Sequence, residues 1–159
     1  MKLARILVPL DGSMLAETAL AAACSLAARH GATISLVRAA EVTTLPGADT
    51  AEAQGMAIRE AEEYLARVVG LLADKGIGPV ETHVWYGPAA ASIVEAAVAQ
   101  KIDLIVMSTH GHSGLGRLVF GSVAESVRGT TVPILIVRGE NAPVEIPRGT
   151  TQAERTSHV

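Results

Sequence analysis

The stretch DLIVMSTHGHSGLGRLVFGS, residues 103–122, carries the strongest indication of fold in this chain. Its residues 104–107 are apolar and indicate a buried strand, whereas the rest is rich in glycine and precedes a helix-like segment at residues 123–127. A strand that ends in glycines before a helix is a common anion-binding arrangement. Glycine lets backbone N–H groups approach a ligand closely, and the helix N-terminus offers unpaired N–H donors. The stretch therefore predicts a site for a nucleotide or another phosphate compound.

Composition excludes several classes of protein. The 159 residues are 49% hydrophobic and 18% charged, which fits one globular domain and not a disordered chain. The formal net charge of −3 argues against a nucleic-acid partner, which would select a basic face. A single cysteine, Cys24, excludes a disulfide framework within the chain. No apolar run reaches the ~18 residues of a membrane span, and Asp11 comes too early for a signal peptide, so we expect a cytoplasmic protein without a membrane partner.

The hydrophobic pattern alternates between strands and helices along the chain. Short apolar strands followed by helices predict an open parallel sheet with helices on both faces. The alternation in residues 80–86 and Pro133 near the start of the last strand indicate edge strands. We expect one domain over residues 1–139 and a flexible tail at 140–159. Strands are expected at residues 4–10, 32–37, 80–86, 103–107 and 132–137, with helices at about 14–30, 51–75, 88–98 and from 121.

Two strand ends carry polar residues that could form a site. PLDGS (residues 9–13) follows the first strand and STHG (residues 108–111) follows the fourth. Ligands of open parallel sheets bind beyond the carboxyl ends of the strands, so these segments would face one crevice if the two strands are neighbours. Asp11 could accept hydrogen bonds from ribose hydroxyls, or it could be the N-cap of the helix at about 14–30. Both interpretations stay open at this point.

The glycine-rich stretch favours binding over rapid chemistry. Gly121 and Ser122 suit a phosphate, although they also suit an ordinary capped helix start. Arg117 could contact phosphate or be plain surface charge, and His110 and His112 have no neighbouring carboxylate or cysteine in the motif that would indicate a metal. The P-loop lysine, the dinucleotide pattern G-x-G-x-x-G after the first strand and a nucleophile elbow are all missing from the sequence.

Taken together, four segments resemble the universal stress protein family over residues 2–138. They are ILVPLDGS (6–13), DLIVMSTHGHSGLGR (103–117), GSVAE (121–125) and VPILIV (132–137). ATP-binding members carry the signature G-x2-G-x9-G-[ST]. Gly111 matches its second glycine, and Gly121 followed by Ser122 matches its third. The first glycine position holds Ser108, which is a departure from the signature.

The resemblance implies a fold and a site. The fold would be α/β, Rossmann-like and similar to adenine nucleotide alpha hydrolases, with an open five-stranded parallel sheet in the order 3-2-1-4-5. Asp11 would meet the ribose of ATP, Ala39 and Met107 would lie near adenine, and Mg or Mn could accompany the phosphates. A homodimer would form through the strand at 132–137. The nucleotide-binding residues would be Pro9, Leu10, Asp11, Gly12, Ser13, Ala39, Met107, Ser108, His110, Gly111, Arg117, Gly121, Ser122 and Val123.

Three functional hypotheses follow from the sequence and the resemblance. The first is an ATP-binding protein of the stress response that acts by binding rather than by efficient catalysis, with no catalytic residue assigned. The second is a slow metal-dependent ATPase or phosphotransferase. The third is a nucleotide-free dimeric interaction module, which Ser108 favours because it places a side chain at a position that the signature keeps free of one.

Overall fold

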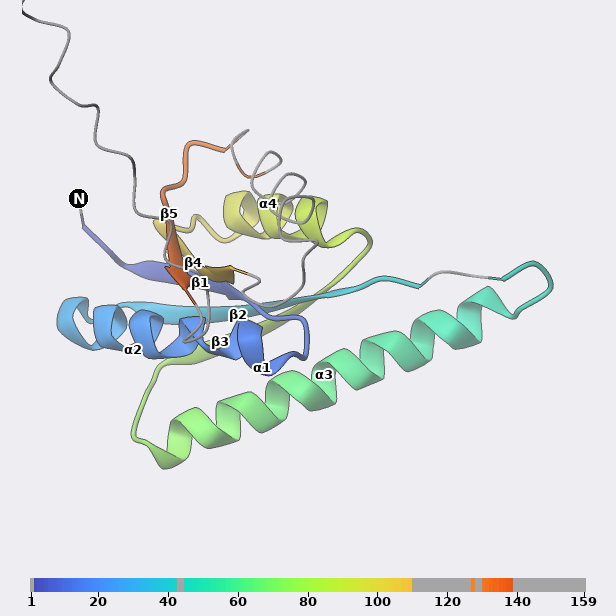
Figure 1. The fold of residues 1–159 in the computed structure, drawn as a ribbon, viewed down its shortest axis with the longest axis horizontal. Coiled ribbons are helices and arrows are strands. Elements are labelled where there is room, and N and C mark those ends of the chain that lie inside the picture. Colours follow the sequence, from blue (N-terminus) through green and yellow to red (C-terminus); the bar gives the residue numbers. More distant parts are fainter. Residues whose placement is uncertain (1, 43–44, 110–126, 128–129, 139–159) are drawn as a thin grey trace, which may run out of the picture.

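A five-stranded parallel sheet forms the centre of the molecule, with strand order β3-β2-β1-β4-β5 (Figure 1). The computed structural model describes residues 2–42, 45–109, 127 and 130–138. The predicted fold class and strand order are confirmed. The strands are β1 (Arg5–Pro9), β2 (Thr33–Ala40), β3 (Val80–Tyr86), β4 (Leu104–Thr109) and β5 (Ile134–Arg138), and the helices are α1 (Met14–Glu17), α2 (Ala19–His30), α3 (Thr50–Asp74) and α4 (Ala89–Ala99).

The central strand β1 divides the core into two layers. Ile6, Leu7 and Val8 are all fully buried, which explains why this strand is apolar at every position and not only at alternate ones. Ile6 and Val8 belong to the core cluster under α2 and α3, whereas Leu7 belongs to the cluster under α4. Figure 1 shows the same division, with α1, α2 and α3 on one side of the sheet and α4 on the other.

The helix expected at about 14–30 is interrupted at Thr18, which corrects the prediction. The Thr18 N–H donates to the Leu15 carbonyl, three residues back, at 3.1 Å, and the Thr18 hydroxyl donates to the same carbonyl at 2.6 Å. This local hydrogen bonding competes with the regular pattern of four-residue spacing, so α1 ends and α2 starts anew. The predicted end of the helix at residue 30 is confirmed, and Gly31, with φ +65°, is the C-cap of α2.

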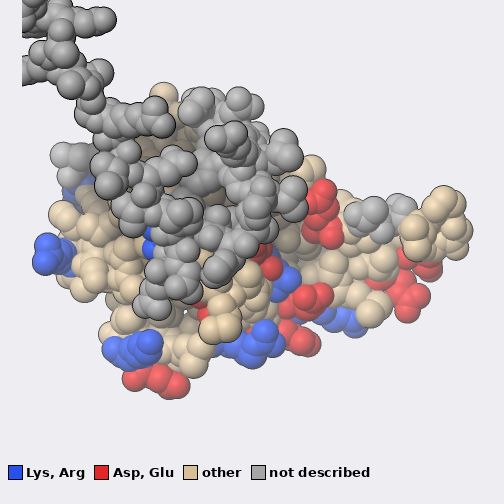
Figure 2. Space-filling view, in the orientation of Figure 1, with Lys and Arg blue, Asp and Glu red and all other residues tan. Residues whose placement is uncertain are grey.

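Helix α3 is long and carries a charged outer face. Asp49 caps it, because its carboxylate accepts hydrogen bonds from the backbone N–H groups of Ala51 and Glu52 at 3.0 and 3.3 Å. Acidic and basic side chains are interspersed along this part of the surface (Figure 2). Four charged residues of α3 are exposed to solvent, namely Glu60, Glu62, Glu63 and Arg67.

Both predicted edge strands lie at the edges of the sheet. β3 has the expected bounds, and its central residues are half-buried. β5 begins at Ile134, two residues later than expected, because Pro133 has no N–H to donate; its carbonyl accepts from Ile105 at 2.9 Å. The helix expected from residue 121 (apart from Val127) and the tail expected at 140–159 lie outside the described residues. Within the described ranges, no helix has the length and apolarity needed to cross a membrane.

Candidate functional site

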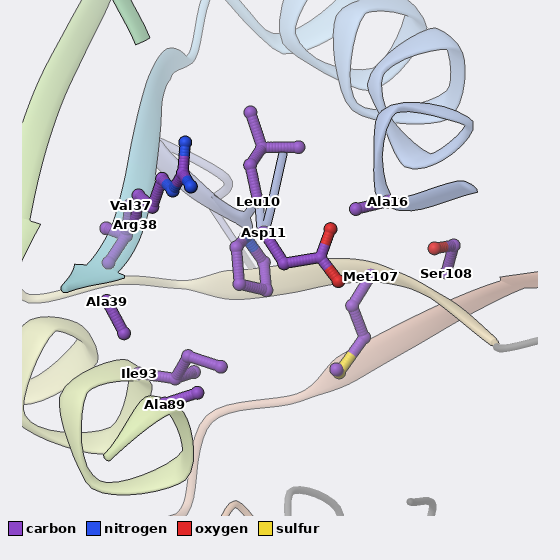
Figure 3. A pocket seen from close by; sticks show the side chains of 11 residues that line it. Leu10, Asp11, Ala16, Val37, Arg38, Ala39, Ala89, Ile93, Met107 and Ser108 are labelled. Atoms are coloured by element: carbon purple, nitrogen blue, oxygen red, sulfur yellow. The ribbon is translucent and has the colours of Figure 1, made fainter. Parts of the chain in front are cut away.

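A cavity of about 270 Å³ opens at the carboxyl ends of the strands, where β1 pairs with β2 on one side and β4 on the other (Figure 3). This is the switch in strand order at which parallel sheets bind their ligands. Six of its lining residues belong to the set expected from the sequence: Pro9, Leu10, Asp11, Ala39, Met107 and Ser108. Five further lining residues were not expected: Ala16, Val37, Arg38, Ala89 and Ile93.

The loop between β1 and α1 presents Asp11 to this crevice. Ser13, not Asp11, is the N-cap of α1, because its hydroxyl accepts a hydrogen bond from the Ala16 N–H at 3.1 Å. Asp11 Oδ1 accepts from the backbone N–H of Ser13 at 2.9 Å and from the Ser13 hydroxyl at 2.5 Å. Asp11 Oδ2 has no hydrogen-bond partner among the described residues, and the side chain is exposed. Of the two interpretations left open for Asp11, the N-cap is therefore wrong.

The remainder of the crevice is largely apolar. Ala39 ends β2 on one side, Met107 lies on β4, and Ala89 and Ile93 come from the first turns of α4 (Figure 3). The small side chains at positions 39 and 89 leave room for a flat group between β2 and α4. Sites for small molecules commonly combine such apolar walls with a few polar groups that fix orientation. This crevice therefore suits a planar apolar ring attached to a polar portion near Asp11.

Ser108 lies at the far side of the crevice from Ala39 (Figure 3). It is half-buried near the end of β4, and its register partner on β5 is Val137. The residue that departs from the glycine signature is thus a lining residue of the cavity. Its side chain is small and polar, so it narrows the site while offering a hydroxyl that can donate and accept hydrogen bonds.

A cluster of charged and aromatic side chains lies behind the Asp11 loop. The Arg38 guanidinium stacks over the Tyr64 ring, 4.8 Å from its centroid, and Arg38 Nη2 donates to Glu60 Oε1 at 3.1 Å. The Tyr64 hydroxyl donates to Glu17 Oε1 at 2.8 Å. Burial, with the Glu17 hydrogen bond adding to it, raises the pKa of the Tyr64 phenol well above its ordinary value. Tyr64 therefore remains a hydrogen-bond donor throughout the neutral range.

Not every expected site residue lines the cavity or falls within the described residues. Gly12 and Ser13 are described but do not line it; they shape the loop that carries Asp11. The residues expected around the phosphates lie outside the described part of the chain: His110, Gly111, Arg117, Gly121, Ser122 and Val123. The placement of these residues stays a prediction.

Cys24 and His83 both lie outside the crevice. Cys24 is half-buried against the core cluster under α2 and α3, and burial raises the pKa of its thiol, as expected for a small hydrophobic residue. His83 is half-buried on β3, with Nε2 lying 3.7 Å from Glu81 Oε2. Within the described ranges, no three His, Cys, Asp or Glu side chains come together in a way that could hold a metal ion.

Comparison with known proteins decides the family. Residues 2–138 match the model of the universal stress protein family. The chain belongs to that family. A universal stress protein of Methanocaldococcus jannaschii is 31% identical over 138 residues, which cover 84% of this chain and 81% of the relative. A Staphylococcus aureus protein whose name places it in the same family is 32% identical over 145 residues, covering 88% and 87% of the two chains.

Solved structures of universal stress proteins share the fold. UspA from Lactobacillus plantarum has a TM-score of 0.73 at 24% identity, covering 87% of this chain and 99% of its own. A universal stress protein solved in complex with cAMP has a TM-score of 0.68 at 23% identity, covering 86% and 98%. The Archaeoglobus fulgidus universal stress protein, solved in complex with dAMP, has a TM-score of 0.60 at 25% identity, covering 86% and 98%.

Proposed function

We propose that this universal stress protein binds an adenine nucleotide, with ATP as its ligand, in the crevice between β1, β2, β4 and α4. The observation that carries the proposal is the pairing of an apolar slot with one oriented carboxylate. Asp11 Oδ1 is engaged by Ser13, so Oδ2 remains available to accept hydrogen bonds from the ribose hydroxyls. The base would occupy the slot between Ala39 and Ala89, beside Met107.

Three further points support an adenine nucleotide. The relatives solved with cAMP and dAMP carry adenine in a protein of the same fold. An apolar slot favours the base with few exocyclic polar groups, because each buried polar group without a partner costs free energy. The predicted phosphate residues, from Gly111 to Val123, follow β4 directly in the sequence, so a nucleotide that points its phosphates toward that end could reach them.

The proposed role is binding in a stress response, in the cytoplasm, rather than efficient catalysis. Asp11 is the only acidic side chain lining the crevice among the described residues, and its geometry suits hydroxyl recognition. The predicted Mg or Mn would sit on the phosphates of ATP, where it would neutralise their charge. We further propose that the protein forms a homodimer through β5, because Leu135 and Ile136 on this edge strand are 39% and 41% exposed.

Native mass spectrometry of the protein, purified without added nucleotide, tests the proposal. The expected result is a species heavier by the mass of one adenine nucleotide, which disappears on mild heating. Ser108 gives the matched comparison, because it lines the crevice in place of a glycine. Ser108→Gly should retain the nucleotide at equal or higher occupancy, whereas Ser108→Val should lose it. If all three proteins are nucleotide-free and take up no added ATP, the nucleotide-free interaction module is the correct alternative.

A further inference from the structure

The guanidinium of Arg38 lies next to Gly12 in the loop that carries Asp11. Gly12, the residue after Asp11, has φ +87°, a conformation that side-chain-bearing residues rarely adopt. A Cβ on Gly12 would lie 3.4 Å from Arg38 Nη2 and 3.5 Å from both Nη1 and Cζ. The guanidinium therefore fills the space beside Gly12 that a side chain at this position would enter. In Figure 3 the Arg38 side chain extends to the side of Leu10 and away from Ala89 and Ile93.

Two side chains of α3, Tyr64 and Glu60, hold the Arg38 side chain in place. Its guanidinium lies over the ring of Tyr64, which is only 5% exposed, and its Nη2 donates to Glu60 at 3.1 Å. The Tyr64 hydroxyl continues the chain of contacts to Glu17, the last residue of α1, at 2.8 Å. The Arg38 side chain is 16% exposed. Arg38 and Tyr64 together thus connect β2, α3 and the end of α1.

Several charged side chains surround the Arg38 guanidinium and the Tyr64 ring. Asp11, Glu17 and Glu60 are the carboxylates near Tyr64 and Arg38, and Arg67 stacks on Tyr64 at 5.7 Å from its centroid. A cation stacked on an aromatic ring and partly removed from water is stabilised by both the ring and nearby carboxylates. Removing the Arg38 side chain would empty the space beside Gly12 and take one of the two cations away from these carboxylates.

We propose that Arg38 is a positioning residue for ligand recognition: by filling the space beside Gly12, it keeps the loop in place and the Asp11 carboxylate directed toward the crevice, for the hydroxyls of a ribonucleotide. Arg38 also lines the cavity, but its positioning role acts through Asp11. The proposal rests on the proposed function, since it concerns the same crevice. It predicts that Arg38 contributes more to affinity for ligands that have the hydroxyls which Asp11 binds than for ligands that lack them.

The test compares two ligands on matched variants by calorimetry. AMP carries both ribose hydroxyls, and 2′,3′-dideoxy-AMP carries neither. In the wild-type protein we expect AMP to bind about tenfold more tightly than the dideoxy ligand, the amount expected for a hydrogen bond to a charged group. In Arg38→Met this ratio should fall toward one, because AMP loses more affinity than the dideoxy ligand does. Arg67→Met is the control, since Arg67 stacks on Tyr64 without touching Gly12, and it should keep the wild-type ratio.

Other results of this experiment would contradict either the positioning role of Arg38 or the nucleotide site itself. If Asp11→Asn lowers the ratio but Arg38→Met does not, the positioning role is wrong and the proposed nucleotide site stands. A loss of affinity for both ligands by the same factor in Arg38→Met would also reject positioning, because it indicates general damage to the crevice. If the wild-type protein binds neither ligand, both the proposed function and the positioning role of Arg38 are rejected. Arg38→Gln repeats the comparison with a planar neutral side chain, should the Met variant not fold.

Discussion

The Asp11 carboxylate and the Ser13 side chain form one hydrogen-bonded unit at the start of α1. Asp11 Oδ1 accepts from both the N–H and the hydroxyl of Ser13, and the Ser13 hydroxyl in turn accepts from the Ala16 N–H. The residue that caps the helix is therefore also the residue that orients the carboxylate of the proposed site. If the proposed site is correct, helix stability and ligand recognition depend on the same residue.

Substituting Ser13 should affect stability and binding together. Ser13→Ala removes the N-cap acceptor, and we expect it to lower the free energy of unfolding by about 1 kcal/mol, measured by urea denaturation. It also removes one of the two donors to Asp11, so affinity for AMP should fall. Ser13→Thr keeps the hydroxyl and should stay close to wild type in both measurements. An Ala variant with unchanged stability would show that the cap contributes nothing.

Filling the apolar slot should abolish tight binding while preserving the fold. Ala89, the first residue of α4, lines the crevice. Ala91 lies two residues further along the same helix, is exposed and does not line the crevice. Ala89→Leu should weaken AMP binding by about tenfold or more, since apolar pockets discriminate on this scale for a few carbon atoms. Ala91→Leu should leave affinity unchanged in the same equilibrium dialysis experiment. Equal affinities in the two variants would place the base elsewhere.

Tyr64 should make stability depend on pH in the alkaline range. Burial and the Glu17 hydrogen bond raise its pKa in the folded protein above the ordinary value of about 10. Below about pH 10 the phenol is protonated in both states, and its contribution is fully present. Above that pH the unfolded chain loses the proton first, so the stability contributed by Tyr64 declines as pH rises. Urea denaturation at a series of pH values measures this decline.

The variant Tyr64→Phe isolates that contribution. Between pH 7 and 9 it should be less stable than wild type by about 1–2 kcal/mol, because the hydrogen bond to a carboxylate is lost. Above about pH 10 the difference should shrink. Tyr86→Phe is the control, since Tyr86 is 54% exposed and should not alter the slope. A difference between wild type and Tyr64→Phe that grows with pH would contradict the assigned direction of the pKa.

The exposed edge of β5 should decide the oligomeric state. A lysine at position 136 would place a charge on an apolar strand edge that the proposed homodimer buries. We expect wild-type protein to run as a dimer by light scattering coupled to gel filtration, and Ile136→Lys to run as a monomer. Val98→Lys, on the exposed face of α4, is the matched control and should remain dimeric. A monomeric wild-type protein would reject the dimer outright.

Much of the fold could be predicted because its elements have clear local boundaries. β3 lies between two Gly-Pro pairs, at residues 78–79 and 87–88, and its predicted bounds agree with the structure. The interruption at Thr18 could not be predicted in the same way. The apolar residues Leu15, Ala19 and Ala22 keep helical spacing across Thr18. The hydrophobic pattern therefore gives no indication of the hydrogen bond from the Thr18 hydroxyl that ends α1.

The candidate site could be predicted only in part, because some of its residues are brought there by tertiary packing. Strand ends such as Asp11 and Ser108 are identified by sequence position, because the carboxyl ends of parallel strands meet at one edge. Ala89 reaches the crevice only through the packing of α4 across β2. Arg38 looks like an ordinary strand residue between Val37 and Ala39, and its contacts with Gly12 and Tyr64 depend on how α3 covers the sheet.

Calorimetric titration of ATP and AMP into wild-type protein and Asp11→Asn tests the central claim most directly. The claim is that the crevice beside Asp11 binds an adenine nucleotide through its ribose hydroxyls. We expect saturable binding of one nucleotide per chain to the wild-type protein and about tenfold weaker binding to Asp11→Asn, in line with the loss of a charged hydrogen-bond acceptor. Absence of any binding by wild-type protein up to millimolar nucleotide, or equal affinity in the two proteins, would contradict it.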